Sequence, residues 1–171
     1  QPSYKHYLKI IKNTCTGHEE PVTIPSEELA DLARLAEEHC TVPFVLSSFR
    51  GTPFYSSMLQ RTRSMMLNYY QIDQFTRHTV SLLEDNGIDC ILLKGISLAS
   101  CYPVPEYRKL GDLDLYISRK SDVSKAQRLL ESHGYIAENE LSDHHLTYHY
   151  TFPKTGRRFL LELHYRVVGM Y

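Results

Sequence analysis

The chain has 171 residues, of which 42% are hydrophobic and 23% are charged, and its 19 basic and 20 acidic side chains give a formal net charge of −1 at pH 7. This length is sufficient to bury a hydrophobic core, and the composition is that of an ordinary globular protein rather than a disordered chain. No apolar run approaches the roughly 20 residues that a membrane-spanning helix needs. The near-zero net charge gives no argument for a large nucleic-acid-binding surface.

Two features bear on where the protein is found. The start of the chain lacks the apolar stretch of a signal peptide, which favours a cytoplasmic location. The four cysteines form no CxxC pair and no spacing typical of zinc ligands, so we expect reduced structural thiols.

The first half of the chain has the apolar spacing of helices. Residues 4–11 and 26–40 carry apolar side chains at helical intervals, and the longest periodic stretch runs over residues 57–86. Gly87 is suited to end this last helix, because glycine readily takes the left-handed conformation that caps a helix. We therefore expect a helical region over residues 1–87 that packs on the core formed by the rest of the chain.

From residue 88 onward, strand and helix patterns alternate. The apolar run Ile88–Leu93 is too short for a typical helix, so it predicts a strand that is covered on both faces and lies centrally in a sheet. Residues 121–133 have a helical pattern that ends before Gly134. The strand formers of residues 144–152, followed by the turn residues 154–157, predict a hairpin into a last strand.

Two aspartates stand at alternate positions of the segment Leu110–Ile117. Because the side chains of a strand alternate between its two faces, Asp112 and Asp114 would share one face while leucines fill the other. Two neighbouring carboxylates repel each other unless a cation offsets their charges, and hard divalent cations prefer oxygen ligands. The pattern therefore predicts a magnesium site.

Further residues fit the same chemistry. A strand that passes through Gly95 into a helix leaves free backbone N–H groups, which suit a phosphate. Glu162 adds a third carboxylate on the polar face of the last strand, and His164 on that face is a candidate for orienting it from a second shell. Arg108 and Lys94 are candidate phosphate contacts. Together these are the parts of two-metal phosphoryl transfer, in which the ions lie about 3.5–4 Å apart.

A resemblance to a known family rests on five segments, which are Ile91–Gly95, a tyrosine and proline segment that ends in Arg108, Gly111–Leu115, Gly134–Tyr135 and Leu161–His164. They resemble the uncharacterised bacterial nucleotidyltransferase family of the DNA polymerase beta superfamily. The resemblance covers most of the chain, and residues 93–115 are its most specific part. It implies an α+β fold, with a nucleotidyltransferase-like mixed sheet over residues 88–171 and a helical region before it.

The resemblance also implies roles for individual residues. Asp112 and Asp114 would be the metal-binding pair, Glu162 the third acid that helps to activate an attacking hydroxyl, and Gly95 and Ser97 the phosphate turn. The implied cofactor is Mg²⁺ or Mn²⁺, and the implied substrate is an NTP such as ATP. The reaction would transfer an NMP group to an acceptor and release pyrophosphate, with the protein mainly positioning substrates and neutralising charge.

Several points stay open at this stage. Protein, RNA, an antibiotic or a sugar phosphate would each suit as the acceptor. An Asp-x-Asp pair after a glycine turn also fits a glycosyltransferase that holds a sugar nucleotide through Mn²⁺. A non-catalytic module of the same fold that binds a nucleotide or a protein is the third reading, since Ile96 separates Gly95 from Ser97 where the superfamily usually has adjacent glycine and serine. Because family members continue past the strand of the third acid, we expect the core to extend beyond Tyr171.

Overall fold

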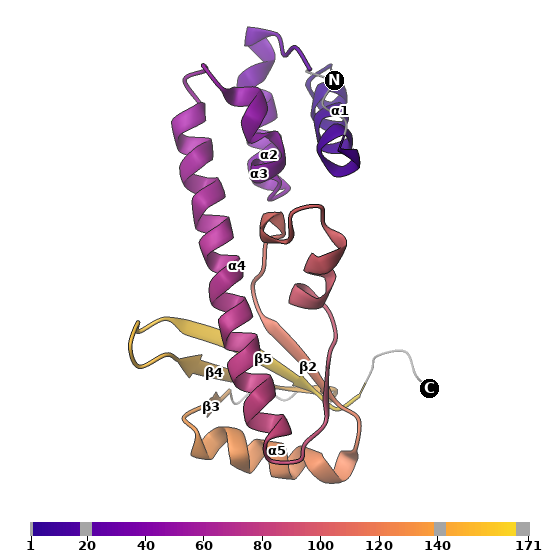
Figure 1. Ribbon diagram of the computed structural model, residues 1–171, viewed down its shortest axis with the longest axis vertical. Coiled ribbons are helices and arrows are strands. Elements are labelled where there is room, and N and C mark those ends of the chain that lie inside the picture. Colours follow the sequence, from indigo (N-terminus) through magenta and orange to yellow (C-terminus); the bar gives the residue numbers. More distant parts are fainter. Residues whose placement is uncertain (1, 18–21, 139–142, 167–171) are drawn as a thin grey trace. The chain divides into compact units, whose positions relative to one another are not determined.

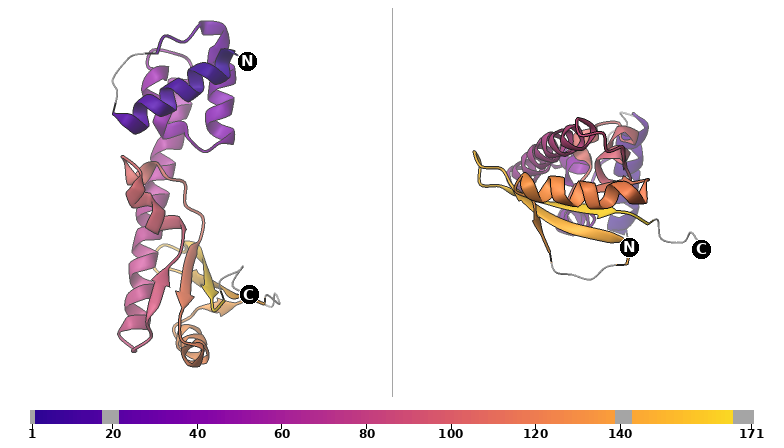
Figure 2. Two further views of the ribbon diagram at one scale, coloured as in Figure 1. Left: turned by 90° about the vertical axis from the view of Figure 1, so that its right-hand side faces the viewer. Right: turned by 90° about the horizontal axis from the view of Figure 1, so that it is seen from below.

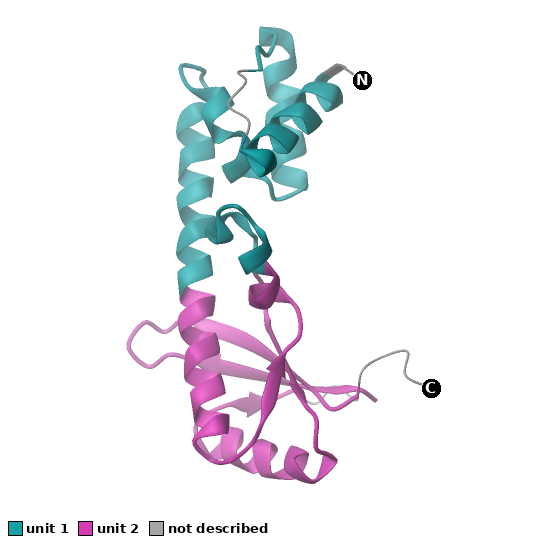
Figure 3. Cartoon of the chain, turned by 45° about the vertical axis from the view of Figure 1, so that its right-hand side comes forward, with its two compact units in different colours: residues 1–70, 99–109 teal, residues 71–98, 110–171 magenta. Residues whose placement is uncertain are grey.

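The computed structural model describes residues 2–17, 22–138 and 143–166. Packing divides the chain into two compact units, shown in Figure 3: unit 1 comprises residues 1–70 and 99–109, and unit 2 comprises residues 71–98 and 110–171. Helix α4 (Tyr55–Glu84) contributes residues to both units. The predicted boundary between two domains after residue 87 stays a prediction. The last five residues of the predicted second domain, 167–171, lie outside the described part of the chain.

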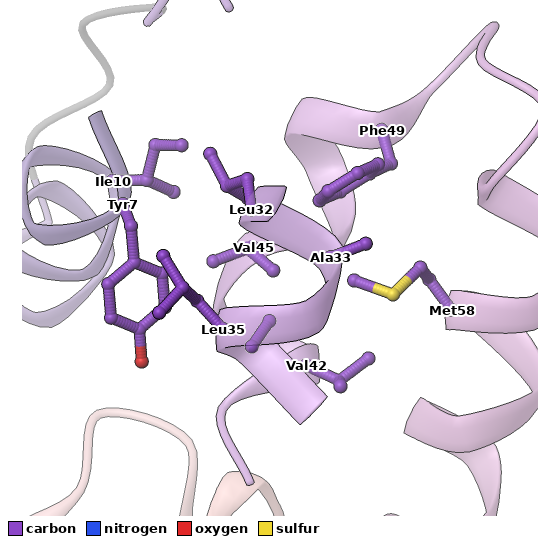
Figure 4. Packing of buried hydrophobic residues seen from close by; sticks show 10 residues of the cluster. Tyr7, Ile10, Leu32, Ala33, Leu35, Val42, Val45, Phe49 and Met58 are labelled. Carbon is purple, nitrogen blue, oxygen red and sulfur yellow. The ribbon is translucent and has the colours of Figure 1, made fainter. Parts of the chain in front are cut away.

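Unit 1 is helical, as the apolar spacing predicts. It contains α1 (Pro2–Thr16), α2 (Leu29–Glu38), α3 (Val42–Val45) and the first part of α4, with short 3-10 helices at 26–28, 46–49 and 105–107. Figure 4 shows how the side chains of these helices fill one core. The buried members of this core are Tyr7, Ile10, Leu32, Ala33, Leu35, Ala36, Val42, Val45, Phe49 and Met58. The expected N-terminal helical region is therefore confirmed.

Helix α4 follows the predicted long periodic stretch. Most of the side chains that recur at intervals of three or four along this stretch are buried, namely Met58, Thr62, Ile72, Thr76, Thr79 and Leu83. Met65 and Tyr69, which belong to the same series, are half-buried. Gly87 lies just beyond the helix with a φ of +68°, the left-handed conformation expected of a glycine at a helix end.

Unit 2 contains a five-stranded mixed sheet (Figure 1). Its strands are β1 (Cys90–Leu92), β2 (Leu113–Ile117), β3 (Ile136–Ala137), β4 (His145–Thr151) and β5 (Arg158–His164), arranged in the order β1-β2-β5-β4-β3. Strands β2 and β5 run parallel, and the other neighbours are antiparallel. The expected α+β class with a mixed sheet is confirmed, and so is the hairpin of β4 and β5.

The expectation of a central strand at residues 88–93 is wrong. In the described part of the chain β1 pairs only with β2, so it is an edge strand, and β2 lies inside the sheet between β1 and β5. Ile88 is completely buried but precedes the strand, whereas Ile91 within the strand is 54% exposed. A short apolar run indicates that some of its residues are buried. It does not indicate how many neighbouring strands pair with it.

The two faces of the sheet differ in chemistry. Phe75 of α4 stacks on Phe159 of β5 with ring centroids 4.9 Å apart, and α5 (Lys120–Ser132) runs alongside the strands (Figure 2). The helix-covered face carries large apolar side chains of β2, β4 and β5, among them Leu113, Leu115, Tyr148, Leu161 and Leu163. Strand alternation therefore places the polar side chains of β2 and β5 on the opposite face.

The structure has no candidate for a membrane span in the residues it describes. None of their helices combines the length and the apolar character that a crossing would require.

A buried hydroxyl pair links α4 to the strand region of unit 2. Tyr135 is 2% exposed, and its hydroxyl lies 2.8 Å from Oγ1 of Thr79, whose own hydroxyl donates to the carbonyl of Phe75. The Tyr135 hydroxyl is therefore the donor of the pair. Burial raises the pKa of Tyr135, so this hydroxyl stays protonated throughout the neutral range.

The variant Tyr135→Phe is expected to lower the free energy of unfolding by about 1 kcal/mol, because it removes one buried hydrogen bond and leaves the ring in place. Urea unfolding followed by circular dichroism measures this loss. Tyr4→Phe is the matched control, since Tyr4 is 46% exposed. An equal loss of unfolding free energy in both variants would show that the Tyr135 hydroxyl makes no stabilising buried hydrogen bond.

The four cysteines are free thiols that differ in exposure, since Cys15 and Cys101 are exposed while Cys40 and Cys90 are partly buried. Burial raises the pKa of Cys90 to about 11, and the negative charges of Glu84 and Asp89 add to the effect. The thiolate is the form that reacts with alkylating agents.

At pH 8 we expect iodoacetamide to modify Cys15 and Cys101 well before Cys90, because little of the Cys90 thiol is ionised at that pH. The rate at Cys90 should then rise with pH towards the raised pKa of about 11. Peptide mass spectrometry at timed intervals measures each site separately. Modification of Cys90 at the same rate as Cys15 at pH 8 would show that this thiol is not protected.

Candidate functional site

The candidate site is built by the parallel pair β2 and β5. In this pair Asp114 is the register partner of Glu162, and Tyr116 is the partner of His164. Both strands alternate polar and apolar residues, and Leu113, Leu115, Leu161 and Leu163 are all at most 1% exposed on the helix-covered side. The buried leucines thus hold Asp114 and Glu162 next to each other on the opposite face.

The polar ends of three side chains from these strands lie close together. Nε2 of His164 lies 3.1 Å from Oδ1 of Asp114 and 3.3 Å from Oε2 of Glu162. One ligand atom from each of the three residues lies within 4.8 Å of the other two. Asp114 is buried, and Glu162 and His164 remain partly accessible. Two carboxylates and one imidazole at these separations can hold a divalent cation.

Lys94 supplies a positive charge to the same group. Its Nζ atom lies 2.9 Å from Oδ1 of Asp114 and 4.0 Å from Oε2 of Glu162. The hydrogen bond to Asp114 raises the pKa of Lys94, so the ammonium is charged at neutral pH. A buried carboxylate is costly without a partner, and Lys94 offsets part of the cost of burying Asp114.

One oxygen of Asp114 has no hydrogen-bond partner among the residues that the structure describes. Oδ2 is buried and accepts no hydrogen bond from the described residues. Gly95 lies beside this oxygen, and a Cβ atom at that glycine would come within 4.0 Å of it. A buried acceptor left unsatisfied costs about 1–3 kcal/mol. A cation bound to Asp114 would satisfy this oxygen, so the residues present fit a metal ion.

The turn after β1 lies directly beside β2. Gly95 has a φ of +62° and begins a 3-10 helix over Gly95–Cys101, where a short helix was expected. The backbone N–H of Leu93 donates to the carbonyl of Asp114 at 3.2 Å. The hydroxyl of Ser97 donates to the carbonyl of Leu93 at 3.0 Å, so this side chain helps to hold the turn. The predicted phosphate contacts of Gly95 and Ser97 stay predictions.

Asp112 does not belong to the group of three ligands. It precedes β2 and is half-buried. Its charge contributes to the raised pKa of Lys94, and its carbonyl oxygen lies near Gly95. In the structure, the group formed by Asp114 contains His164 rather than the second aspartate of the predicted pair. The metal-binding role of Asp112 stays a prediction.

Arg108 lies in unit 1, whereas the other predicted site residues lie in unit 2. Within unit 1 its guanidinium donates to the hydroxyl of Tyr102 at 3.0 Å and lies over the Tyr102 ring. The predicted contact between Arg108 and a phosphate stays a prediction.

Two aspects of the site go beyond the reading of the sequence. His164, expected to support the acids from a second shell, is itself a member of the group of possible ligands. Its Nε2 atom lies within 3.3 Å of an oxygen of each acid. The spacing Glu162-x-His164 contains this signal, because alternate residues of a strand share a face. His145 is the cross-strand partner of His164, with ring centroids 5.2 Å apart, and only the pairing of β4 with β5 reveals it.

Comparison with known proteins identifies the family. A family model described as "Uncharacterised nucleotidyltransferase" matches residues 25–170, a range that includes every strand of the sheet and all residues of the candidate site. No curated protein and no solved structure matched the chain. Because the match covers well over half of the 171 residues, the chain belongs to this uncharacterised nucleotidyltransferase family.

Proposed function

We propose that the protein is a metal-dependent nucleotidyltransferase, which moves an NMP group from an NTP to an acceptor and releases pyrophosphate. Membership of the family supports nucleotidyl transfer in general. The observation that carries the metal dependence is the buried oxygen of Asp114 that no described residue hydrogen-bonds, within a group that also contains Glu162 and His164.

Asp114, Glu162 and His164 would hold the cation, with Asp112, which directly precedes β2, as a further carboxylate. The preference of Mg²⁺ and Mn²⁺ for oxygen ligands fits the two carboxylates of the group. When bound, such an ion supplies positive charge that neutralises phosphate oxygens and polarises the reacting phosphoryl group.

The remaining roles belong to the chain's own side chains and backbone. Lys94 and the backbone of the Gly95 turn are proposed to bind the phosphates of the nucleotide. Glu162 is proposed to accept the proton of the attacking hydroxyl, since it is the more exposed carboxylate of the pair, with 23% of its side chain accessible against 0% for Asp114. ATP is the nucleotide proposed for testing first, and a cytoplasmic location remains an expectation.

A non-catalytic nucleotide-binding module is the second candidate. It is favoured by the hydroxyl of Ser97, which bonds to backbone carbonyls of its own turn. In a transferase of this kind, that serine is expected to reach a phosphate. The two candidates differ in whether a covalent product forms.

In a thermal-shift measurement, Mn²⁺ together with ATP is expected to raise the midpoint of the wild-type protein, because a ligand that binds only the native state stabilises it. At a ligand concentration 100 times its dissociation constant the gain is about 2.7 kcal/mol. Asp114→Asn should abolish the shift, since it removes the buried charge and keeps the shape of the side chain.

Asp31→Asn makes the same charge change on the exposed surface of α2 and should keep the full shift. A shift that survives in Asp114→Asn would place the metal elsewhere. Incubation of the protein with α-labelled NTPs and cell extract then separates the two candidates. Transfer of label by the wild type but not by Glu162→Gln supports the enzyme, and absence of transfer with all four NTPs supports the binding module.

A further inference from the structure

The ammonium of Lys94 contacts the two carboxylates that would hold a metal ion. Oδ1 of Asp114 lies 2.9 Å from Nζ of Lys94 and 3.1 Å from Nε2 of His164. The same lysine reaches Oε2 of Glu162 at 4.0 Å. The two carboxylates of the proposed metal centre therefore already share one internal cation.

A divalent ion and this ammonium would repel each other at Asp114. Oxygen ligands lie about 2.0–2.1 Å from Mg²⁺, so an ion on Oδ1 of Asp114 would stand within a few ångströms of the Lys94 nitrogen. Like charges at such a distance repel each other, and water screens only part of this repulsion because Asp114 is buried while Lys94 is 55% exposed. An ion bound by Oδ1 of Asp114 would thus push the ammonium of Lys94 away from that oxygen, so Lys94 would have to move.

The structure allows this movement. The side chain of Lys94 is 55% exposed, and lysine carries its charge on a flexible four-carbon stem. Its backbone lies between two restrained neighbours, since Leu93 is hydrogen-bonded to Asp114 and Gly95 begins the helical turn. The ammonium can leave Asp114 while the backbone at this position stays fixed.

We propose that Lys94 is an exchangeable counter-ion that couples metal binding to nucleotide binding. In the metal-free protein Lys94 neutralises Asp114. When a divalent cation binds together with a nucleotide, the ammonium moves from Asp114 to the phosphate oxygens beside the Gly95 turn. The metal–nucleotide complex then binds better than the free ion, because only the complex provides new partners for the displaced charge. This proposal rests on the proposed function. It adds that the divalent cation replaces Lys94 at Asp114 while Lys94 moves to the phosphates.

Lys94→Met tests the exchange, because methionine keeps a flexible stem of similar length and removes the charge. Free Mn²⁺, measured by electron paramagnetic resonance without nucleotide, is expected to bind this variant about three- to tenfold more tightly than the wild type. Mn²⁺-bound ATP, measured by isothermal titration calorimetry, is expected to bind it about three- to tenfold more weakly. A merely structural lysine would not change the two affinities in opposite directions.

Two further variants control the experiment. Lys94→Arg keeps the positive charge and should bind free Mn²⁺ as weakly as the wild type. Lys154→Met removes one positive charge from an exposed turn of the same unit and should change neither affinity. If Lys94→Arg binds Mn²⁺ as tightly as Lys94→Met, the effect does not come from the charge and the proposal is wrong.

The remaining outcomes separate this proposal from the proposed function. Wild-type binding of Mn²⁺-bound ATP that depends on Asp114, with unchanged affinity for free Mn²⁺ in Lys94→Met, refutes the exchange and leaves the nucleotidyltransferase assignment standing. Tighter Mn²⁺ binding with unchanged ATP affinity refutes the coupling to nucleotide. Absence of Mn²⁺ binding in both proteins, with and without ATP, refutes both proposals.

Discussion

The parallel pairing of β2 with β5 is the constraint on which the candidate site depends. It makes Asp114 the direct neighbour of Glu162 and brings His164 within 3.1 Å of Asp114. A slip of one residue in either strand would turn a carboxylate into the apolar layer beneath the helices and expose a leucine in its place. The burial of Leu115 and Leu163 therefore fixes the face of the sheet on which the polar residues lie.

Charge balance is the second property of this site. Lys94 contacts both Asp114 and Glu162, and Asp114 retains a buried oxygen that has no hydrogen-bond partner in the described part of the chain. A carboxylate that served only the stability of the sheet would be expected to have both oxygens satisfied. A carboxylate oxygen left in this way is available to a cation, which agrees with membership of a nucleotidyltransferase family.

The sequence predicts helices and hairpins better than it predicts which distant strands pair in the sheet. The helices of unit 1, the long helix α4 and the hairpin of β4 and β5 were all predictable, because helical spacing and turn chemistry act over neighbouring residues. The position of β1 at the edge of the sheet was not predictable. Its apolar run includes Ile88, which is buried outside the strand, so the run resembles that of a strand covered on both faces.

The sequence by itself determined which chemistry-bearing residues share a strand face, because side chains alternate with a period of two whatever the strand pairs with. Glu162 with His164 could be read in this way. Only the tertiary structure decided that β5 lies beside β2, that His164 meets Asp114 across 50 positions of sequence, and that Lys94 turns towards them. These contacts depend on strand order and register, which arise from the packing of distant segments against the helices and have no local signature in the chain.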